Sequence, residues 1–384
     1  MNPRLLLTVF LAACHPVASG PAADDRPAQA DALRPEPTFD LSSLRRRLSR
    51  QYTGTLPHAS GAVVVAVASG ATDVVLGFGA RSAEDRETPD ENTAFGIGSL
   101  TKVMTGVALA DAVEQGLVSL DDEAQRFLPD VTVPRYDDHP VRLGHLATYS
   151  SGLPWMPTNW VERDKGPYSD AMWREFLSGY ALPHAPGDGF EYGNVGFGML
   201  GFALAAREHV PLGELLRARV FGRLGMQHTW FFDERPEGAD VAHGYDDKGS
   251  PVPLRSDTPF FPGCCALEST AHDLLAFLRA HWDESTPAEL RRALDMALLP
   301  RRKGEGAYAG QEVGLGWFMA DGLATKSGLM KGFRTGIALD RAGRRAAVVL
   351  AADARFPSEV LAVQALRALA VEQDAPGTTA PVHE

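Results

Sequence analysis

The stretch FGIGSLTK occupies residues 95–102 and opens a predicted helix that runs from Ser99 to Gln115. Ser99 and Lys102 are three residues apart, so on a helix they share one face and the lysine amine can reach the serine hydroxyl. A serine hydroxyl is a weak nucleophile unless a base lies beside it, and a lysine of lowered pKa can be that base. Alone, Ser-x-x-Lys is a weak signal, because both residue types are common on solvated helix faces.

Two later motifs make this signal specific. Tyr192 and Asn194 form a Tyr-x-Asn motif, and Lys326, Ser327 and Gly328 lie in a predicted strand. In this order the three motifs resemble those of the penicillin-recognising serine hydrolases, the superfamily of serine β-lactamases and penicillin-binding peptidases. The Tyr-x-Asn variant, in place of Ser-Asp-Asn, looks like the class C β-lactamase branch and its relatives.

The resemblance covers the chain from about Leu41 to the last predicted helix. Residues 144–154 read GHLATYSSGLP and are similar to the loop that the family carries between its first two motifs. Segments at 196–201, 224–226 and 269–274 are also similar to family segments, in the expected order.

Hydrophobic patterns predict an α+β fold. Strands are predicted at 61–68, 73–80, 314–320, 324–326, 335–339 and 346–352. They would join into one antiparallel β-sheet, flanked by N- and C-terminal helices at 41–52 and 357–371. An inserted, mostly helical domain separates the two halves of the sheet. The resemblance implies the same architecture, the β-lactamase/transpeptidase-like fold.

At 384 residues the chain exceeds the usual size of a single core, which favours two structural units. The predicted parts are a signal or lipoprotein peptide (1–20), a flexible tether (21–37), a discontinuous sheet domain (38–104 and 305–373), a helical domain (105–304) and a disordered tail (374–384). Within the helical domain, residues 119–122 are expected to cap and begin a short helix.

Residues 1–20 have the pattern of an export signal, a short positive region followed by an apolar one. Residues 11–14 read LAAC and resemble a bacterial lipobox, in which Cys14 becomes the lipidated first residue. The alternative is a plain secretory signal, cut near Ser19 or Gly20. Both alternatives predict a periplasmic or other extracytoplasmic protein, and the first adds a membrane contact through the lipid anchor.

Charge and cysteine content argue against several classes. The formal net charge is -12 and the longest basic stretch is residues 45–47, so we expect no nucleic-acid partner. Cys264 and Cys265 are adjacent, and a bond between them would close a strained ring. Nothing near them offers metal-ligand spacing, so we expect two thiols packed at a turn, with their role open. The expected chemistry uses no metal and no cofactor.

For acyl transfer, the resemblance implies that Ser99 is the nucleophile and Lys102 its immediate base or relay. Tyr192 would be a phenol of lowered pKa that carries the proton to the leaving group. Lys102 and Tyr192 form a coupled pair, and the resemblance does not decide which of them takes the first proton. Asn194 would hydrogen-bond Lys102 and the substrate amide.

The third motif is implied to bind the substrate. Lys326 and Ser327 would meet a substrate carboxylate, and Lys326 would add positive charge near the tyrosine. Gly328 would allow close approach of the strand backbone. The backbone amides of Ser99 and Leu329 would form the oxyanion hole. Two histidines, His145 and His272, are expected to have structural roles.

The expected function is a serine hydrolase that forms an acyl-enzyme on a small-molecule substrate, either a β-lactam or a D-Ala-type peptidoglycan peptide. Two alternatives are an esterase on the same scaffold and a β-lactam- or muropeptide-binding lipoprotein that is acylated without turnover. Met156 stands where class C enzymes carry a glutamine, and residues 329–331 read LMK where a small or polar residue is usual. These departures argue against efficient cephalosporinase activity.

Overall fold

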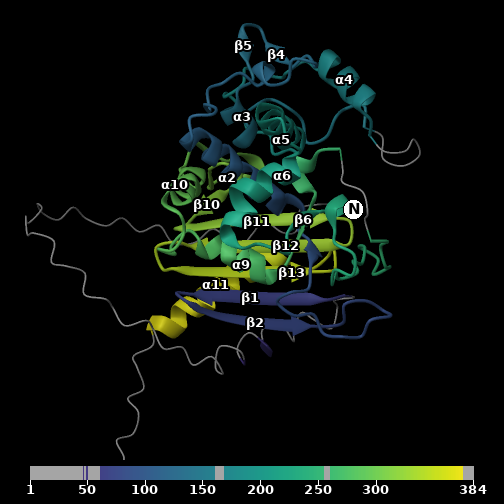
Figure 1. The fold of residues 1–384 in the computed structure, drawn as a ribbon, viewed down its shortest axis with the longest axis vertical. Helices are drawn as coiled ribbons and strands as arrows, with labels where there is room; N and C mark the ends of the chain where they lie inside the picture. The colour runs from purple at the N-terminus through teal and green to yellow at the C-terminus, as the bar shows by residue number, and fades with distance from the viewer. Residues whose placement is uncertain (1–45, 47–48, 51–60, 161–167, 255–259, 375–384) are drawn as a thin grey trace, which may run out of the picture. The chain divides into compact units, whose positions relative to one another are not determined.

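The computed structural model of the chain describes residues 46, 49–50, 61–160, 168–254 and 260–374, all within one compact unit (Figure 1). The predicted signal peptide with Cys14, the tether, most of the N-terminal helix and nearly all of the tail lie outside these ranges. The boundaries between a sheet domain and a helical domain remain a proposal. None of the helices in the described ranges has both the length and the apolar character that crossing a bilayer requires.

An eight-stranded antiparallel sheet joins the two ends of the described chain (Figure 1). In spatial order its strands are β2 (Thr72–Phe78), β1 (Val63–Ser69), β13 (Arg345–Ala351), β12 (Phe333–Asp340), β11 (Leu323–Met330), β10 (Phe318–Ala320), β9 (Glu312–Val313) and β8 (Arg302–Lys303). The early hairpin pairs with the last strand, with Val63 opposite Ala351. The predicted single antiparallel sheet is therefore confirmed.

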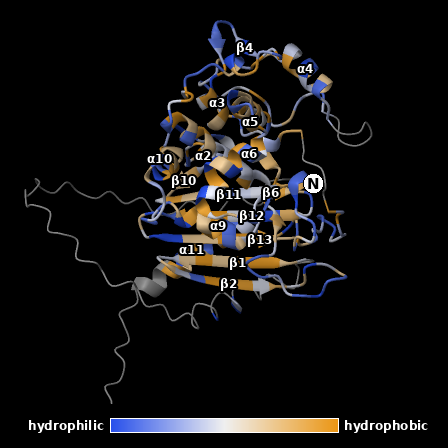
Figure 2. Cartoon of the chain, viewed as in Figure 1, coloured by the Kyte–Doolittle hydropathy of each residue, from blue (hydrophilic) through white to orange (hydrophobic). Residues whose placement is uncertain are grey.

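Strand β1 is buried on both faces, which explains its unbroken run of valine and alanine. Helix α11 (Ser358–Asp374) packs on β12 and β13, and α9 (Ala271–Arg279) packs on β13 and β1. Side chains alternate between the two cores: Val64 belongs to the cluster that includes Leu274, and Val65 to the cluster that includes Leu366. Figure 2 shows β1 almost wholly in the colour of hydrophobic residues.

Most of the helices lie in the sequence between β2 and β8. They are η2 (Gly98–Leu100), α2 (Thr101–Glu114), η3 (Ala124–Arg126), α3 (Leu143–Ala147), α4 (Asp170–Gly179), α5 (Val195–Glu208), α6 (Leu212–Leu216), the π-helical turn η4 (Arg217–Phe221), α7 (Gly222–Leu224), η5 (Phe232–Glu234), α8 (Pro262–Cys265), α9 and α10 (Ala288–Ala297). A further turn, η6 (Gly306–Tyr308), joins β8 to β9. Two small sheets complete the unit, β3-β7-β6 (Phe95–Gly96, Leu267–Ser269, Trp230–Phe231) and β4-β5 (Arg135–Tyr136, His139–Pro140).

Helix α2 directly follows the turn that contains Ser99. Every residue from Thr101 to Ala112 is buried, because α10, α5 and α8 all pack against the helix. At Gly106 an added Cβ would lie 2.2 Å from the carbonyl oxygen of Leu315, so the segment before β10 also lies directly on α2.

Two local predictions are wrong, and two short strands were missed. Residues 119–122 form a turn in which the Asp122 carboxylate accepts the Ser119 amide at 2.8 Å, and the helical turn η3 follows it. Strand β10 begins only at Phe318, because Gly316 has a φ of 86° and turns the chain. The short strands β8 and β9 were not predicted, since two-residue strands have no readable alternation.

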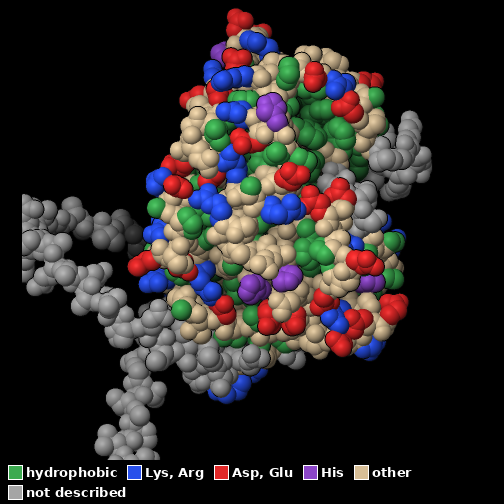
Figure 3. Space-filling view, viewed as in Figure 1, with side chains coloured by type: hydrophobic (Ala, Val, Ile, Leu, Met, Phe, Trp, Pro, Cys, Tyr) green, Lys and Arg blue, Asp and Glu red, His purple; other side chains and the backbone are tan. Residues whose placement is uncertain are grey.

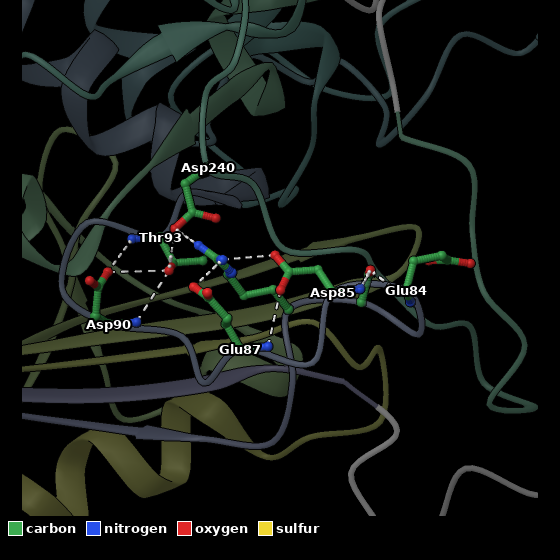
Figure 4. A network of polar contacts seen from close by, with 8 residues as sticks. Glu84, Asp85, Glu87, Asp90, Thr93 and Asp240 are labelled. Carbon is green, nitrogen blue, oxygen red and sulfur yellow. Dashed lines mark hydrogen bonds and ion pairs between the residues drawn. The ribbon is translucent and has the colours of Figure 1, made fainter.

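A cluster of charged side chains fixes the loop between β2 and β3 (Figure 4). Arg81 forms ion pairs with Asp85, Glu87 and Asp240 at 2.8, 2.6 and 2.6 Å. The Thr93 hydroxyl donates to the same Asp240 carboxylate at 2.9 Å. Because β3 follows two residues later and leads into η2, the cluster helps to position the segment that contains Ser99.

The face of the molecule in Figure 3 carries acidic and basic side chains side by side. No continuous basic patch is seen on this face. The distribution agrees with the acidic net charge of -12.

Gly336 gives a test of how α11 docks on the sheet. An added Cβ would lie 2.6 Å from the backbone nitrogen and Cα of Glu359, so Gly336→Ala should force the helix away. We expect the free energy of unfolding to fall by about 1–3 kcal/mol, measured by chemical denaturation. The control is Gly179→Ala, where an added Cβ meets nothing within 4 Å and stability should hold or rise slightly. Equal stabilities for the two variants would contradict this packing.

Candidate active site

Ser99 lies in η2, where strand β11 crosses the turn. The preceding Gly98 has a φ of 53°, which glycine adopts without steric strain. An added Cβ there would lie 2.9 and 3.0 Å from the backbone oxygen and nitrogen of Leu329. The two backbone segments that were expected to form an oxyanion hole therefore lie against each other.

Gly328 allows this contact. A Cβ at Gly328 would lie 2.0 Å from the carbonyl oxygen of Ile97 and 2.3 Å from Oγ1 of Thr335. The Thr335 hydroxyl itself donates to the Ile97 carbonyl at 3.0 Å. Only a residue without a side chain fits between β12 and the turn, which is the close approach that the sequence predicted for this glycine.

Lys102 is completely buried behind Ser99. Its Nζ donates to Ser99 Oγ at 3.0 Å, to Asn194 Oδ1 at 2.8 Å and to the Cys264 carbonyl oxygen at 3.2 Å. A lysine ammonium has three N–H donors, and here each has an acceptor. The geometry therefore suits a charged Lys102.

Tyr192 lies between two ammonium groups. Nζ of Lys326, which is 2% exposed, donates to the Tyr192 hydroxyl at 3.3 Å. The Nζ atoms of Lys326 and Lys102 lie 4.5 and 5.3 Å from the centre of the Tyr192 ring. The phenol therefore contacts one cation and lies close to the other.

These charges determine which groups keep their protons. Burial by itself raises the pKa of Tyr192, but the positive charges of Lys102 and Lys326 outweigh this effect and lower the pKa to about 8. Burial lowers the pKa of Lys326 to about 8, against the opposing effect of Tyr192. For Lys102 burial also lowers the pKa, but Tyr192 raises it and the net shift is upward. Lys102 thus stays charged at neutral pH, where part of Tyr192 is ionised.

Asn194 is held from two sides. Its backbone amide donates to the Trp155 carbonyl oxygen at 2.9 Å, and its Nδ2 donates to the sulfur of Met156 at 3.4 Å. The Met156 sulfur therefore accepts the hydrogen bond that the side-chain amide of Asn194 donates. The family resemblance implies a glutamine at the position of Met156. Sulfur is a weak acceptor, so this contact is weaker than an amide-to-amide hydrogen bond.

Ser327 and Leu329 are less tightly connected to the cluster. Ser327 is half-buried opposite Gly336, and its hydroxyl makes no hydrogen bond to any residue in the described ranges. Leu329 has 55% of its surface exposed, so its apolar side chain lies beside the site in contact with solvent.

Helix α8 contains both cysteines and supports Lys102. Cys264 is buried, Cys265 is half-buried, and both are free thiols, but they lie in a short helix and not at the predicted turn. The carbonyl oxygen of Gly263 accepts a hydrogen bond from the Thr105 hydroxyl at 2.8 Å. Together with the hydrogen bond from Lys102 to the Cys264 carbonyl oxygen, this contact joins α8 to the first turns of α2.

Both histidines have structural contacts. Nδ1 of His145 accepts the backbone amide of Arg142 at 3.2 Å, at the start of α3. His272 lies in the first turn of α9, which Thr270 caps by accepting the Asp273 amide at 3.2 Å.

Sequence reasoning missed Tyr149. It lies in the loop after α3, is 3% exposed, and its hydroxyl accepts a hydrogen bond from Lys326 Nζ at 3.0 Å, closer than Tyr192 does. Its φ of 57° is rare for an aromatic residue. The only sequence signal was its place within the family-like loop at 144–154, which says nothing about where the ring points.

Comparison with known proteins agrees with this arrangement. Residues 50–372 match the Beta-lactamase family model. The chain belongs to the beta-lactamase family. This confirms the predicted membership of the penicillin-recognising serine hydrolases, and with it the expectation of a serine hydrolase.

Individual relatives are distant. A beta-lactamase of Pseudomonas fluorescens is 25% identical over 276 residues, which cover 72% of this chain and 74% of the relative. The D-alanyl-D-alanine-carboxypeptidase/endopeptidase AmpH of Escherichia coli K12 is 31% identical over 187 residues, 47% of this chain and 48% of AmpH. The matched stretch thus spans only about half of AmpH.

Solved structures share the fold. The D-alanine carboxypeptidase AmpC from Burkholderia cenocepacia has a TM-score of 0.73 at 24% identity, covering 86% of this chain and 99% of that chain. A class C beta-lactamase in complex with cefoxitin has a TM-score of 0.74 at 21% identity, covering 87% and 100%. These likenesses confirm the predicted β-lactamase/transpeptidase-like fold of this beta-lactamase-family chain.

Tyr192 should ionise at pH about 8, whereas an unperturbed phenol ionises near 10. Removing a cation destabilises the phenolate, so Lys326→Met should raise the pKa of Tyr192. Ultraviolet difference titration of tyrosinate measures both values. Tyr192→Phe is the control and should remove the low-pH step, and a step left unchanged by Lys326→Met would refute the assigned cause.

Proposed function

We propose that the chain hydrolyses β-lactams or D-Ala-type peptidoglycan peptides through an acyl-enzyme on Ser99. The observation that carries the proposal is one site in which the Lys102 ammonium donates to Ser99 Oγ at 3.0 Å and the Lys326 ammonium donates to the Tyr192 phenol at 3.3 Å, whose pKa is about 8. Relatives named beta-lactamase and D-alanyl-D-alanine-carboxypeptidase/endopeptidase support both substrate classes.

In the proposed acylation step, the Tyr192 phenolate accepts the proton of the Ser99 hydroxyl while Oγ attacks the substrate carbonyl carbon. The backbone amides of Ser99 and Leu329 stabilise the oxyanion that develops. As the C–N bond breaks, Tyr192 returns the proton to the leaving nitrogen. In deacylation Tyr192 accepts a proton from a water molecule whose oxygen attacks the ester carbonyl carbon. As the ester bond breaks, Tyr192 returns this proton to Ser99 Oγ, which restores the serine hydroxyl and the phenolate. Lys102 remains an ammonium throughout and stabilises the phenolate.

Substrate binding is proposed for the remaining motif residues. Lys326 and Ser327 would bind a substrate carboxylate, and Asn194 a substrate amide. Lys326 already donates to two phenols, so a carboxylate would add to a site that is partly satisfied. Met156 and the exposed Leu329 place apolar side chains beside the site, which supports peptide or ester turnover over efficient cephalosporin turnover.

Assays with nitrocefin, a D-Ala-D-Ala peptide and a nitrophenyl ester distinguish the possible functions. We expect continuous product release from nitrocefin or a D-Ala-D-Ala peptide, and no release by Ser99→Ala. Release from a nitrophenyl ester alone would make the chain an esterase. One equivalent of product followed by a plateau would make it a non-turnover binder.

Covalent labelling and a second variant control this assay. A fluorescent penicillin should label a peptide that contains Ser99 and should not label Ser99→Ala. Tyr192→Phe should lower turnover by about a hundredfold, as expected for loss of a general acid or base. The exposed Tyr136 on β4 offers a matched tyrosine, and Tyr136→Phe should keep full turnover. Labelling at another serine would refute the nucleophile assignment.

We also propose an extracytoplasmic location with a lipid anchor at Cys14. The support is the LAAC stretch at residues 11–14 that follows an apolar run. In a bacterial host, Cys14→Ala should block lipid attachment and move the protein from the membrane fraction to the soluble fraction. Fractionation and labelling with a radioactive fatty acid measure this, and unchanged processing and fractionation would leave the plain secretory signal as the explanation.

A further inference from the structure

We propose that Tyr149 is a positioning residue of the site, whose hydroxyl holds the Lys326 ammonium against Tyr192 and so keeps Tyr192 in its reactive state. The inference rests on the proposed function, because only there does Tyr192 act as the base. Tyr149 itself need not touch the substrate. It acts through Lys326.

The hydrogen bonds of Tyr149 have a definite direction. Its hydroxyl donates a hydrogen bond to the Gly316 carbonyl oxygen at 3.4 Å. A carbonyl oxygen can only accept, so the Tyr149 hydroxyl must be the donor in this pair. The oxygen lone pairs are then free to accept from Lys326 Nζ at 3.0 Å. The Lys326 ammonium, the neutral Tyr149 phenol and the Gly316 carbonyl thus form a chain of two hydrogen bonds. In this chain the phenol always accepts from the buried ammonium.

The Tyr149 ring is held firmly in this position. It stacks on Phe318 with ring centres 5.5 Å apart and planes 5° apart, and it contacts Phe197 and Tyr192 at 5.2 and 4.9 Å. Its backbone keeps the unfavourable φ of 57° within this packing. A non-glycine residue held in that conformation at a functional site indicates that its position matters.

Lys326 faces charged and titratable groups from several elements. Lys102 on α2 repels it, and Tyr192 before α5 and Glu359 on α11 attract it. Its hydrogen bonds go to the two phenols, Tyr149 and Tyr192. Tyr192 gains and loses a proton during the proposed reaction. Tyr149 stays neutral, so it offers Lys326 the same acceptor at every step.

Tyr149 stays neutral over the working range of the site. Burial, followed by the charges of Tyr192, Tyr308 and Cys264, raises the pKa of Tyr149 well above its usual value. Two neighbouring tyrosines therefore have opposite states: one is a proton carrier and the other a permanent hydrogen-bond partner of the same lysine.

Tyr149→Phe keeps the ring and removes the acceptor. Within the described ranges the only other hydrogen-bond acceptor of Lys326 Nζ is the Tyr192 hydroxyl. A buried ammonium with fewer acceptors loses its proton more easily, so the pKa of Lys326 falls. A Lys326 side chain that is charged less of the time stabilises the Tyr192 phenolate less, so the pKa of Tyr192 rises. The two changes narrow the pH range in which Tyr192 is ionised and Lys326 is charged.

The test is the pH profile of kcat/KM for whichever substrate Ser99 turns over. In Tyr149→Phe the rising limb should move up and the falling limb down by about one pH unit each, with about a tenfold loss at neutral pH. The matched control is Tyr180→Phe, which removes a hydroxyl that donates to Gly152 in the same loop at 3.3 Å without touching Lys326. It should leave both limbs in place. Unmoved limbs in Tyr149→Phe, even with lower kcat, would overturn the proposal.

Tyrosinate titration tests the same inference without turnover. In Tyr149→Phe the ionisation of Tyr192 should shift from about 8 to higher pH. Should that variant not fold, Tyr192→Phe serves instead: a tyrosinate step that persists near 8 would mean that Tyr149 ionises, which overturns the proposal. If Ser99 is not acylated by a fluorescent penicillin, the proposed function fails. If Ser99 is acylated but the titration and the limbs do not move, only the role of Tyr149 fails.

Discussion

Two lysine ammonium groups are buried on either side of one phenol, and the arrangement of the site follows from this constraint. A buried charge is unfavourable unless it is hydrogen-bonded and paired. Lys102 meets three acceptors and Lys326 meets two phenols. The remaining excess of positive charge favours an anion between them, and Tyr192 is the group that can become one. The two buried positive charges thus lower the pKa of Tyr192, the proposed base.

The scaffold brings these groups together from distant parts of the sequence. Helix α2 supplies Lys102, the entry to α5 supplies Tyr192 and Asn194, and strand β11 supplies Lys326. Glycines at the crossing of η2 and β11 let the backbones touch, and the hydroxyl of Thr335 ties them together. The position of Ser99 therefore depends on close backbone contacts and not on flexible side chains.

Much of this could be predicted: the site from the order of three motifs that resemble those of a known family, and the main strands from hydrophobic periodicity. Ser-x-x-Lys on a helix, Tyr-x-Asn and Lys-Ser-Gly on a strand located five residues that the structure joins by contacts, and alternating or continuous apolar runs located the main strands. Helix α2 was harder to orient, since it is buried on all sides and shows no polar face. The titration expected for Tyr192 also required the structure, because it depends on distances to two cations.

Other parts of the site could not be predicted in this way. The carbonyl oxygen of Cys264 binds Lys102, yet a backbone atom leaves no mark in the sequence. Tyr149 reaches Lys326 only because the loop after α3 adopts a left-handed conformation. Met156 meets Asn194 through the path of an irregular loop. Each of these contacts depends on loop geometry, which residue types alone do not determine.

The pairing of β1 with β13 has a consequence for how the protein is made. A ribosome releases the β1–β2 hairpin hundreds of residues before its partner, residues 345–351, exists. During that interval the apolar strand β1 has one open edge, and such segments aggregate readily. Because its contacts are so distant in sequence, the sheet closes slowly and late. The open edge of β1 is therefore the place where wrong strand pairing threatens this chain until residues 345–351 have been made.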